Sequence, residues 1–249
     1  MTDAAGTWAI VPLRGLETAK TRLGTALDAE ERLELVIAMA SRTLTATRDA
    51  SSIAGTVLVT ADPAAAHLAE EFGARTLVQR LPGLNAALRE GRAAAVRAGA
   101  TATIVIPIDL PAIDAFGLDT LLADIAAAGA GGNAGAAGVG AGRDAGAAGA
   151  GAVVALVPDR HRLGTNVLYT SPPDAIDPAF GEGSLEAHRA AAFAAGAHFL
   201  EFGGPLSLDV DTGDDLLAAE STAAGTHRAD TADGRRPGVA TRTGNIDAA

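Results

Sequence analysis

The chain has 249 residues and a formal net charge of −11, and 48% of its residues are hydrophobic although only 3% are aromatic. This acidity disfavours nucleic acid and anionic membranes as partners, and the absence of cysteine from the sequence excludes disulfides and thiolate metal sites. No apolar run approaches the roughly 20 residues that span a bilayer, and no signal-peptide pattern is visible, so we expect a cytoplasmic protein.

Short apolar runs alternate with alanine-rich helical segments up to residue 126. The first helix is expected to begin at Asp28, which forms a capping-box pattern with Glu31 three residues later. Its expected apolar stripe contains Leu33, Ile37, Ala40 and Leu44. The other elements expected in this part are strands at 8–12, 56–60, 75–78 and 103–107, and helices at 64–72, 84–98 and 116–126.

Almost every residue between 126 and 152 is Ala or Gly. We interpret this stretch as a flexible insertion or a frayed helix end. It contains a nominal dinucleotide fingerprint at 140–145, but no strand precedes the motif, which disfavours an oxidoreductase. Strands at 153–157, 167–169 and 199–201 and a helix at 184–195 follow. We expect one domain over 1–221 and a disordered tail over 222–249.

This alternation predicts an α/β protein with a doubly wound, mostly parallel sheet and helices on both of its faces. Ligands of such sheets bind beyond the carboxyl ends of the strands. The loops after Pro12, Thr60 and Pro107 are therefore expected to line the site.

Three cations, Arg14, Lys20 and Arg22, follow the first expected strand. Positive charge at the mouth of a parallel sheet suits a di- or triphosphate. The loop is not a Walker motif, because Ala19 stands where a glycine should precede the lysine. A solvated basic loop is the alternative interpretation.

Carboxylates follow two later strands. Asp109 comes directly after the most apolar strand, and Asp209 and Asp211 are spaced to share one face of an extended segment. Oxygen ligands of this number fit Mg²⁺ that is bound mainly through substrate phosphates. A turn or helix-capping role for Asp109, and a solvated edge for the other pair, are the alternatives.

The segment Gly181-Glu-Gly183-Ser184 opens a helix and offers backbone N–H groups, a hydroxyl and the helix dipole to a phosphate. Ser184 could equally serve as a plain N-cap. The five histidines show no metal-ligand spacing, and no Gly-x-Ser-x-Gly motif is present, so a hydrolase triad is disfavoured.

Together these segments resemble the CofC-type guanylyltransferases of coenzyme F-420 biosynthesis. The stretches that carry the resemblance are Pro12…Lys20-Thr-Arg22-Leu23, Pro82-Gly83-Leu-Asn85, Ile106-Pro-Ile-Asp109-Leu-Pro111, Pro158-Asp-Arg-His161…Gly164-Thr165-Asn166, Phe180-Gly181-Glu-Gly183-Ser184 and Asp209-Val-Asp211-Thr212. The resemblance implies a Rossmann-like nucleotidyltransferase fold of the nucleotide-diphospho-sugar-transferase (GT-A) type.

The resemblance also implies a role for each matching residue. Asp109 and Asp211 would hold the catalytic Mg²⁺. Lys20 would act with them in catalysis, and the phosphates of GTP would meet Lys20, Arg22 and Arg14. Asn85 would lie near the base or ribose, and the residues expected to hold the phosphorylated acid are Thr165, Gly181 and Ser184. The sequence departs from the family pattern at Arg14, where lysine is commoner, at Gly213, which replaces a proline, and in the long Ala/Gly-rich stretch.

The implied reaction transfers GMP from GTP to phosphoenolpyruvate or 2-phospho-L-lactate and releases diphosphate. The Ala/Gly-rich composition is typical of a GC-rich bacterial source, which favours phosphoenolpyruvate. Handover of a labile product to the downstream deazaflavin transferase is a further hypothesis. Two alternatives stay open: another nucleotidyltransferase of this fold, of the cytidylyl or sugar-phosphate type, and a non-catalytic GTP-binding module.

Overall fold

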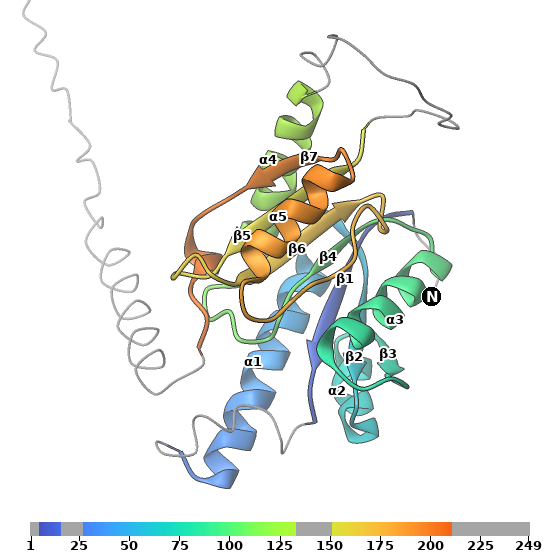
Figure 1. Cartoon of the computed structure of the whole chain (residues 1–249). Coiled ribbons are helices and arrows are strands. Elements are labelled where there is room, and N and C mark those ends of the chain that lie inside the picture. The colour runs from blue at the N-terminus through green and yellow to red at the C-terminus, as the bar shows by residue number, and fades with distance from the viewer. Residues whose placement is uncertain (1–4, 16–26, 133–150, 211–249) are drawn as a thin grey trace, which may run out of the picture.

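The computed structural model describes residues 5–15, 27–132 and 151–210, and these build one seven-stranded sheet between two layers of helices (Figure 1). The strands are β1 (Gly6–Leu13), β2 (Ile53–Thr60), β3 (Arg75–Val78), β4 (Ala100–Val105), β5 (Val153–Pro158), β6 (Thr165–Ser171) and β7 (His198–Glu201). The helices are α1 (Ala29–Asp49), α2 (Ala66–Glu71), α3 (Leu84–Arg97), α4 (Ala115–Gly132) and α5 (Ser184–Ala194).

The strand order is β3-β2-β1-β4-β6-β5-β7. Neighbouring strands are parallel except on the two sides of β6, which runs antiparallel to both β4 and β5. The six residues between β5 and β6 are too few for a parallel crossover, so these two strands pair as a hairpin. The predicted mostly parallel α/β sheet is confirmed, with one inverted strand inside it.

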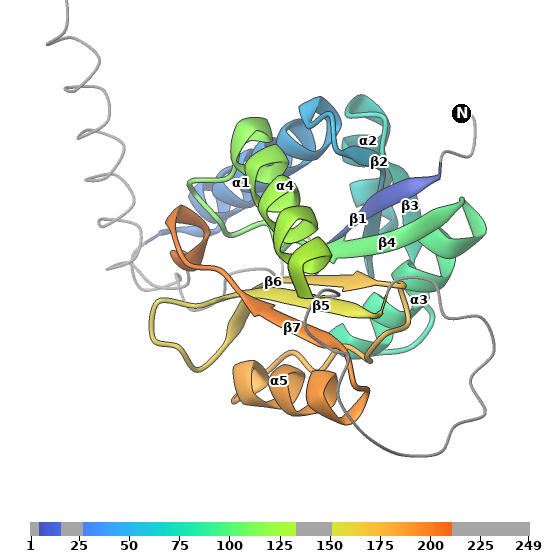
Figure 2. The same cartoon turned by 90° about the horizontal axis from the view of Figure 1, so that it is seen from above.

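Helices α1, α2 and α4 cover one face of the sheet, and α3 and α5 cover the other (Figure 2). The alternation along β1 shows why both faces are apolar. Trp8 and Ile10 pack toward α3, whereas Ala9 and Val11 pack toward the α1 face. A Cβ at Gly91 of α3 would lie only 2.8 Å from Ile10 Cγ2, so this helix approaches β1 closely because it carries a glycine there.

The predicted start of α1 is confirmed, since Asp28 and Glu31 form the capping box. The predicted apolar stripe is partly wrong: Ile37 is 38% exposed. The buried face instead runs through Val36, Ala40 and Leu44, because Ile37 lies about 100° further around the helix than Val36.

The alanine-rich end of α4 extends past residue 126 to Gly132, so the start of the presumed insertion is helical. The alanines at 126–128 favour the continuation, because alanine has the highest intrinsic helix propensity. Residues 133–150, with the nominal fingerprint at 140–145, and the tail from 222 lie outside the described residues. Within the described ranges, no helix combines the length and the hydrophobicity that a bilayer crossing requires.

Candidate active site

The parallel half of the sheet brings the ends of β1 and β4 to one edge. The N–H of Ile106 donates to the carbonyl of Ile10 at 3.0 Å, which extends the pairing beyond the last residue of β4. Arg14 follows β1 and is exposed, while Asp109 follows β4 and is half-buried. Because neighbouring parallel strands end at the same edge, the cation and the carboxylate emerge on the same side of the sheet.

The segment that ends at Val210 lies against the Asp109 loop. The N–H of Val210 donates to the carbonyl of Asp109 at 3.0 Å, and Val210 is buried. Asp211 is the next residue in the chain and lies outside the described residues, as do Lys20 and Arg22. Among the residues that the structure does describe, no group of three or more His, Asp or Glu side chains could hold a metal. The oxygen-only pair Asp109 and Asp211 thus stays a prediction.

The predicted acid-binding residues lie at the start of β6 and the start of α5. Thr165 is 8% exposed and Ser184 is 2% exposed. Gly181 has a φ of +134° and Gly183 a φ of +70°, which are conformations that glycine adopts without strain. The N-cap of α5 is Gly183 and makes no side-chain bond. The alternative role of Ser184 as a plain N-cap is therefore wrong, because Ser184 is already the first helical residue.

A buried histidine joins these two elements. His188 of α5 is 0% exposed. Its Nδ1 lies 3.0 Å from Thr165 Oγ1, and its Nε2 accepts the N–H of Ala179 at 2.9 Å. Burial lowers the pKa of His188 to about 4, so the ring is neutral at pH 7. His188 is not among the site residues predicted from the sequence, although its position four after Ser184 places both on one helix face.

Asn85 binds the loop that contains Ala179 and Phe180. Its Nδ2 donates to the Phe180 carbonyl at 2.9 Å, and its Oδ1 accepts the Phe180 N–H at 2.8 Å. The amide therefore joins the beginning of α3 to the loop that precedes Gly181. The expected contact of Asn85 with the base or ribose remains a prediction, and this clamp is a role that the sequence did not reveal.

The hairpin between β5 and β6 is shaped by Asp159. Its carboxylate accepts the N–H groups of Leu163 and Gly164 at 3.0 and 2.9 Å. A Cβ at Gly164 would lie 2.7 Å from Asp159 Oδ2, so a side chain here would displace the carboxylate that accepts these N–H groups. The turn thereby sets where Thr165 begins β6, which gives the Pro-Asp-Arg-His…Gly-Thr motif a physical reason.

The residue after Thr165 connects the two parts of the site. Asn166 is 5% exposed, and its Nδ2 donates to the Leu206 carbonyl at 2.9 Å. Leu206 belongs to the turn Pro205–Ser207, four residues before Val210, whose N–H binds the Asp109 carbonyl. The segment 206–210 is thus hydrogen-bonded at one end to β6 and at the other to the Asp109 loop.

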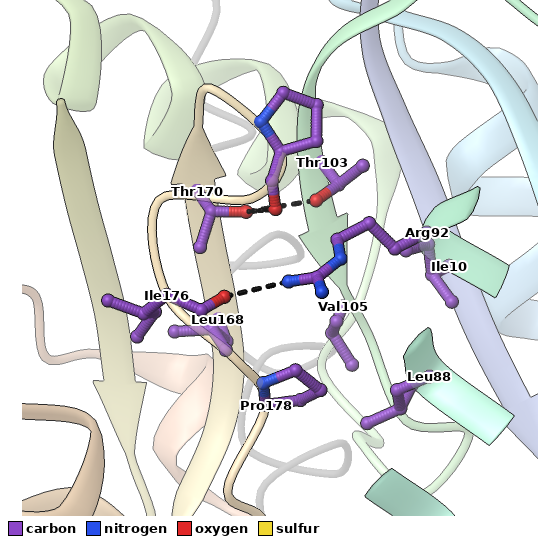
Figure 3. Close-up of a pocket in the computed structure, with 10 residues that line it drawn as sticks. Ile10, Leu88, Arg92, Thr103, Val105, Leu168, Thr170, Ile176 and Pro178 are labelled. Carbon is purple, nitrogen blue, oxygen red and sulfur yellow. Dashed lines mark hydrogen bonds between the residues drawn. The ribbon is translucent and has the colours of Figure 1, made fainter. Parts of the chain in front are cut away.

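The loop that leads to Ala179 is also anchored, beside a small cavity between α3, β4 and β6 (Figure 3). The guanidinium of Arg92 donates to the Ile176 carbonyl at 2.8 Å and pairs with Asp177 at 2.7 Å. Thr170 donates to the Pro173 carbonyl at 3.1 Å. Arg92 and Thr170 thereby anchor this loop to α3 and β6 beside the cavity.

The arrangement can hold a small anion between buried hydroxyls and a helix N-terminus, next to a strand edge that carries a cation and a carboxylate.

Residues 7–134 match the family model described as guanylyl transferase CofC like. A phosphoenolpyruvate guanylyltransferase of Sphaerobacter thermophilus is 37% identical over 84% of this chain and 90% of its own length. One from Rubrobacter xylanophilus is 35% identical over 86% and 94%.

A solved structure shares the fold at low sequence identity. A proposed nucleotide-diphospho-sugar transferase from Desulfovibrio desulfuricans G20 superposes with a TM-score of 0.62, at 15% identity, over 94% of this chain and 90% of that one. The nucleotidyltransferase type of fold that the sequence predicts is confirmed by this likeness.

Proposed function

Because the chain belongs to the family of CofC-like guanylyl transferases, we propose that it transfers GMP from GTP to phosphoenolpyruvate and releases diphosphate. The observation that carries the proposal is the convergence of the acid-binding candidates. Thr165 and Ser184 are 19 positions apart in the sequence, yet His188 bonds to Thr165 and lies one turn from Ser184. Two curated relatives that cover most of the chain bear the name of this reaction.

The reaction joins two anions. A phosphate oxygen of the acid attacks the α-phosphorus of GTP, a new P–O–P bridge forms, and the bond from the α-phosphorus to the β-phosphate oxygen breaks. Diphosphate leaves with the bonding electrons. The attacking oxygen is already ionised near pH 7, so no general base is required, and the protein contributes position and charge.

The acceptor would lie at the N-terminus of α5. There the hydroxyls of Thr165 and Ser184 and the backbone at Gly181 can donate hydrogen bonds to its oxygens, and the helix dipole favours negative charge. Both side chains are buried, which restricts their rotamers before the acid arrives. Preorganised donors of this kind lose little entropy when they bind.

The nucleotide would lie at the carboxyl edge of β1 and β4. Arg14, Lys20 and Arg22 would meet its phosphates and stabilise the departing diphosphate. Asp109 and Asp211 would hold Mg²⁺, which prefers few carboxylate oxygens together with substrate phosphates. When bound, Mg²⁺ would reduce the repulsion between the two anionic reactants. The hydrogen bond from Val210 to Asp109 supports this pairing, since Asp211 follows Val210 directly.

Phosphoenolpyruvate is the proposed acceptor because the relatives named above carry it in their names. The product would enter coenzyme F-420 assembly in the cytoplasm, where GTP and the acid are available. Direct handover of the labile product to a downstream transferase remains a hypothesis.

The test is diphosphate release with GTP, Mg²⁺ and one acid at a time: phosphoenolpyruvate, 2-phospho-L-lactate or 3-phosphoglycerate. ATP, CTP and UTP serve as matched nucleotide controls. We expect release that requires GTP and phosphoenolpyruvate. Release with CTP would support a cytidylyltransferase, and GTP binding without release under any condition would support the non-catalytic module.

A further inference from the structure

The histidine that joins the two acid-binding elements has a defined hydrogen-bonding state. A backbone N–H can only donate, and the N–H of Ala179 points to Nε2 of His188 at 2.9 Å. Nε2 must therefore carry a lone pair. A neutral imidazole has one N–H, so the proton lies on Nδ1.

The state of His188 determines the state of Thr165. With its proton on Nδ1, the ring donates to Thr165 Oγ1 across 3.0 Å. The hydroxyl then acts as an acceptor toward the ring, and its own hydrogen is available for a different partner. Thr165 is 8% exposed and is the first residue of β6, directly after the turn that Asp159 shapes.

We propose that His188 is a positioning residue that holds Thr165 as a hydrogen-bond donor toward an anionic acceptor. The inference rests on the proposed function, because it is the phosphorylated acid that supplies the acceptor oxygen. An anion offers only hydrogen-bond acceptors, so a hydroxyl whose hydrogen pointed at the histidine would repel it. The buried ring prevents that orientation.

The His188 ring also fixes the loop that contains Ala179 and Phe180. Through Nε2 it fixes the N–H of Ala179, and Asn85 fixes both backbone groups of Phe180. The Phe180 ring lies edge-on to His188, with centroids 5.0 Å apart. His188 thereby ties Thr165 to the loop that leads to Gly181.

A double-mutant cycle tests whether His188 acts through Thr165. In His188→Gln the terminal oxygen can still accept the Ala179 N–H, but the Nδ1 donor is gone. Thr165→Val removes the hydroxyl and keeps the shape. We expect His188→Gln to raise the KM for the acid about tenfold, as the loss of one hydrogen bond does, while the KM for GTP changes less than twofold.

In the Thr165→Val background, His188→Gln should add nothing further to the KM for the acid. Full additivity of the two substitutions would overturn the proposal, and so would an unchanged KM in the single His188→Gln variant. The matched control is His198→Gln, the same substitution at a half-buried histidine of β7. If the control raised the KM for the acid equally, loss of packing alone would explain the result and the proposal would fail.

A spectroscopic measurement is independent of activity and of variant folding. ¹⁵N-histidine NMR of the wild-type chain at pH 7, with His188 assigned by through-bond connectivity, reports the tautomer directly. We expect a protonated Nδ1 and an unprotonated Nε2; the Nε2–H tautomer or an imidazolium would overturn the proposal. A wild-type chain without acid-dependent diphosphate release would refute the proposed function instead, and the tautomer would still be measurable.

Discussion

The two halves of the sheet present their functional groups in different ways. In the parallel half, β3-β2-β1-β4, Arg14 and Asp109 emerge from strand ends and are exposed or half-buried. In the half built from β6, β5, β7 and α5, Thr165, Ser184 and His188 are buried and lie within a hydrogen-bonded framework. Charge placed by topology suits a triphosphate, whereas discrimination between small acids needs polar groups held in fixed positions.

The largest expected effect concerns the strand-end carboxylate. Asp109→Asn should lower kcat on the order of 10²-fold or more, because neutralisation of charge by a bound metal is worth several kcal/mol. Diphosphate release at ordinary and at raised Mg²⁺ measures it. Asp124→Asn, on the exposed face of α4, is the matched control. Near-wild-type turnover of Asp109→Asn would remove the metal from this half of the site.

The buried histidine should make the stability of the folded chain depend on pH. Burial lowers the pKa of His188 from 6.5 to about 4, so between these values the unfolded chain binds more protons than the folded one. Stability is then complete above pH 6.5 and falls by about 3 kcal/mol as the pH drops to about 4. Urea unfolding at several pH values measures this slope, and His188→Gln should flatten it; equal slopes in the two proteins would contradict the burial argument.

A substitution at Asn85 tests whether this residue serves the acid or the nucleotide. Asn85→Asp keeps the acceptor for the Phe180 N–H but places an oxygen against the Phe180 carbonyl. We expect the KM for the acid to rise about tenfold, as for the loss of one partly buried hydrogen bond. Steady-state kinetics with each substrate varied in turn provide the measurement. A rise confined to the KM for GTP would assign Asn85 to the nucleotide instead.

The smallest expected effect lies away from the site, at the brace between the α1–β2 turn and α4. Asp119 accepts hydrogen bonds from Ser52 and Ser51, which lower its pKa to about 2. Ser52→Ala should lower Tm by about 2–4 °C at pH 7 and leave KM unchanged. Because the brace needs the ionised carboxylate, the difference in Tm should shrink as the pH falls from about 4 toward 2. A constant difference, measured by thermal unfolding, would argue against an ionic brace.

The sequence predicts the features that depend on local signals, whereas only the fold shows contacts between residues that are far apart in the sequence. Strand periodicity and the capping box of Asp28 predict the sheet and α1 because both are local signals. The position of Asp109 at a strand end also follows from topology. His188 could not be found in this way, since its partners Thr165 and Ala179 are contacts across the fold, and a histidine in an alanine-rich helix carries no motif. The family resemblance implies a nucleotide contact for Asn85. Its clamp on Phe180 could not be predicted because the two residues lie 95 positions apart in the sequence.

The central claim is that GMP moves as a unit onto the acid. Quenched single-turnover reactions with [α-³²P]GTP and, separately, [γ-³²P]GTP test it most directly when phosphoenolpyruvate and Mg²⁺ are present. The α label should appear in a new species that contains both guanosine and the acid, and the γ label should appear in diphosphate. Recovery of the α label in GDP, with the γ label in free phosphate, would show a GTP hydrolase and contradict the account.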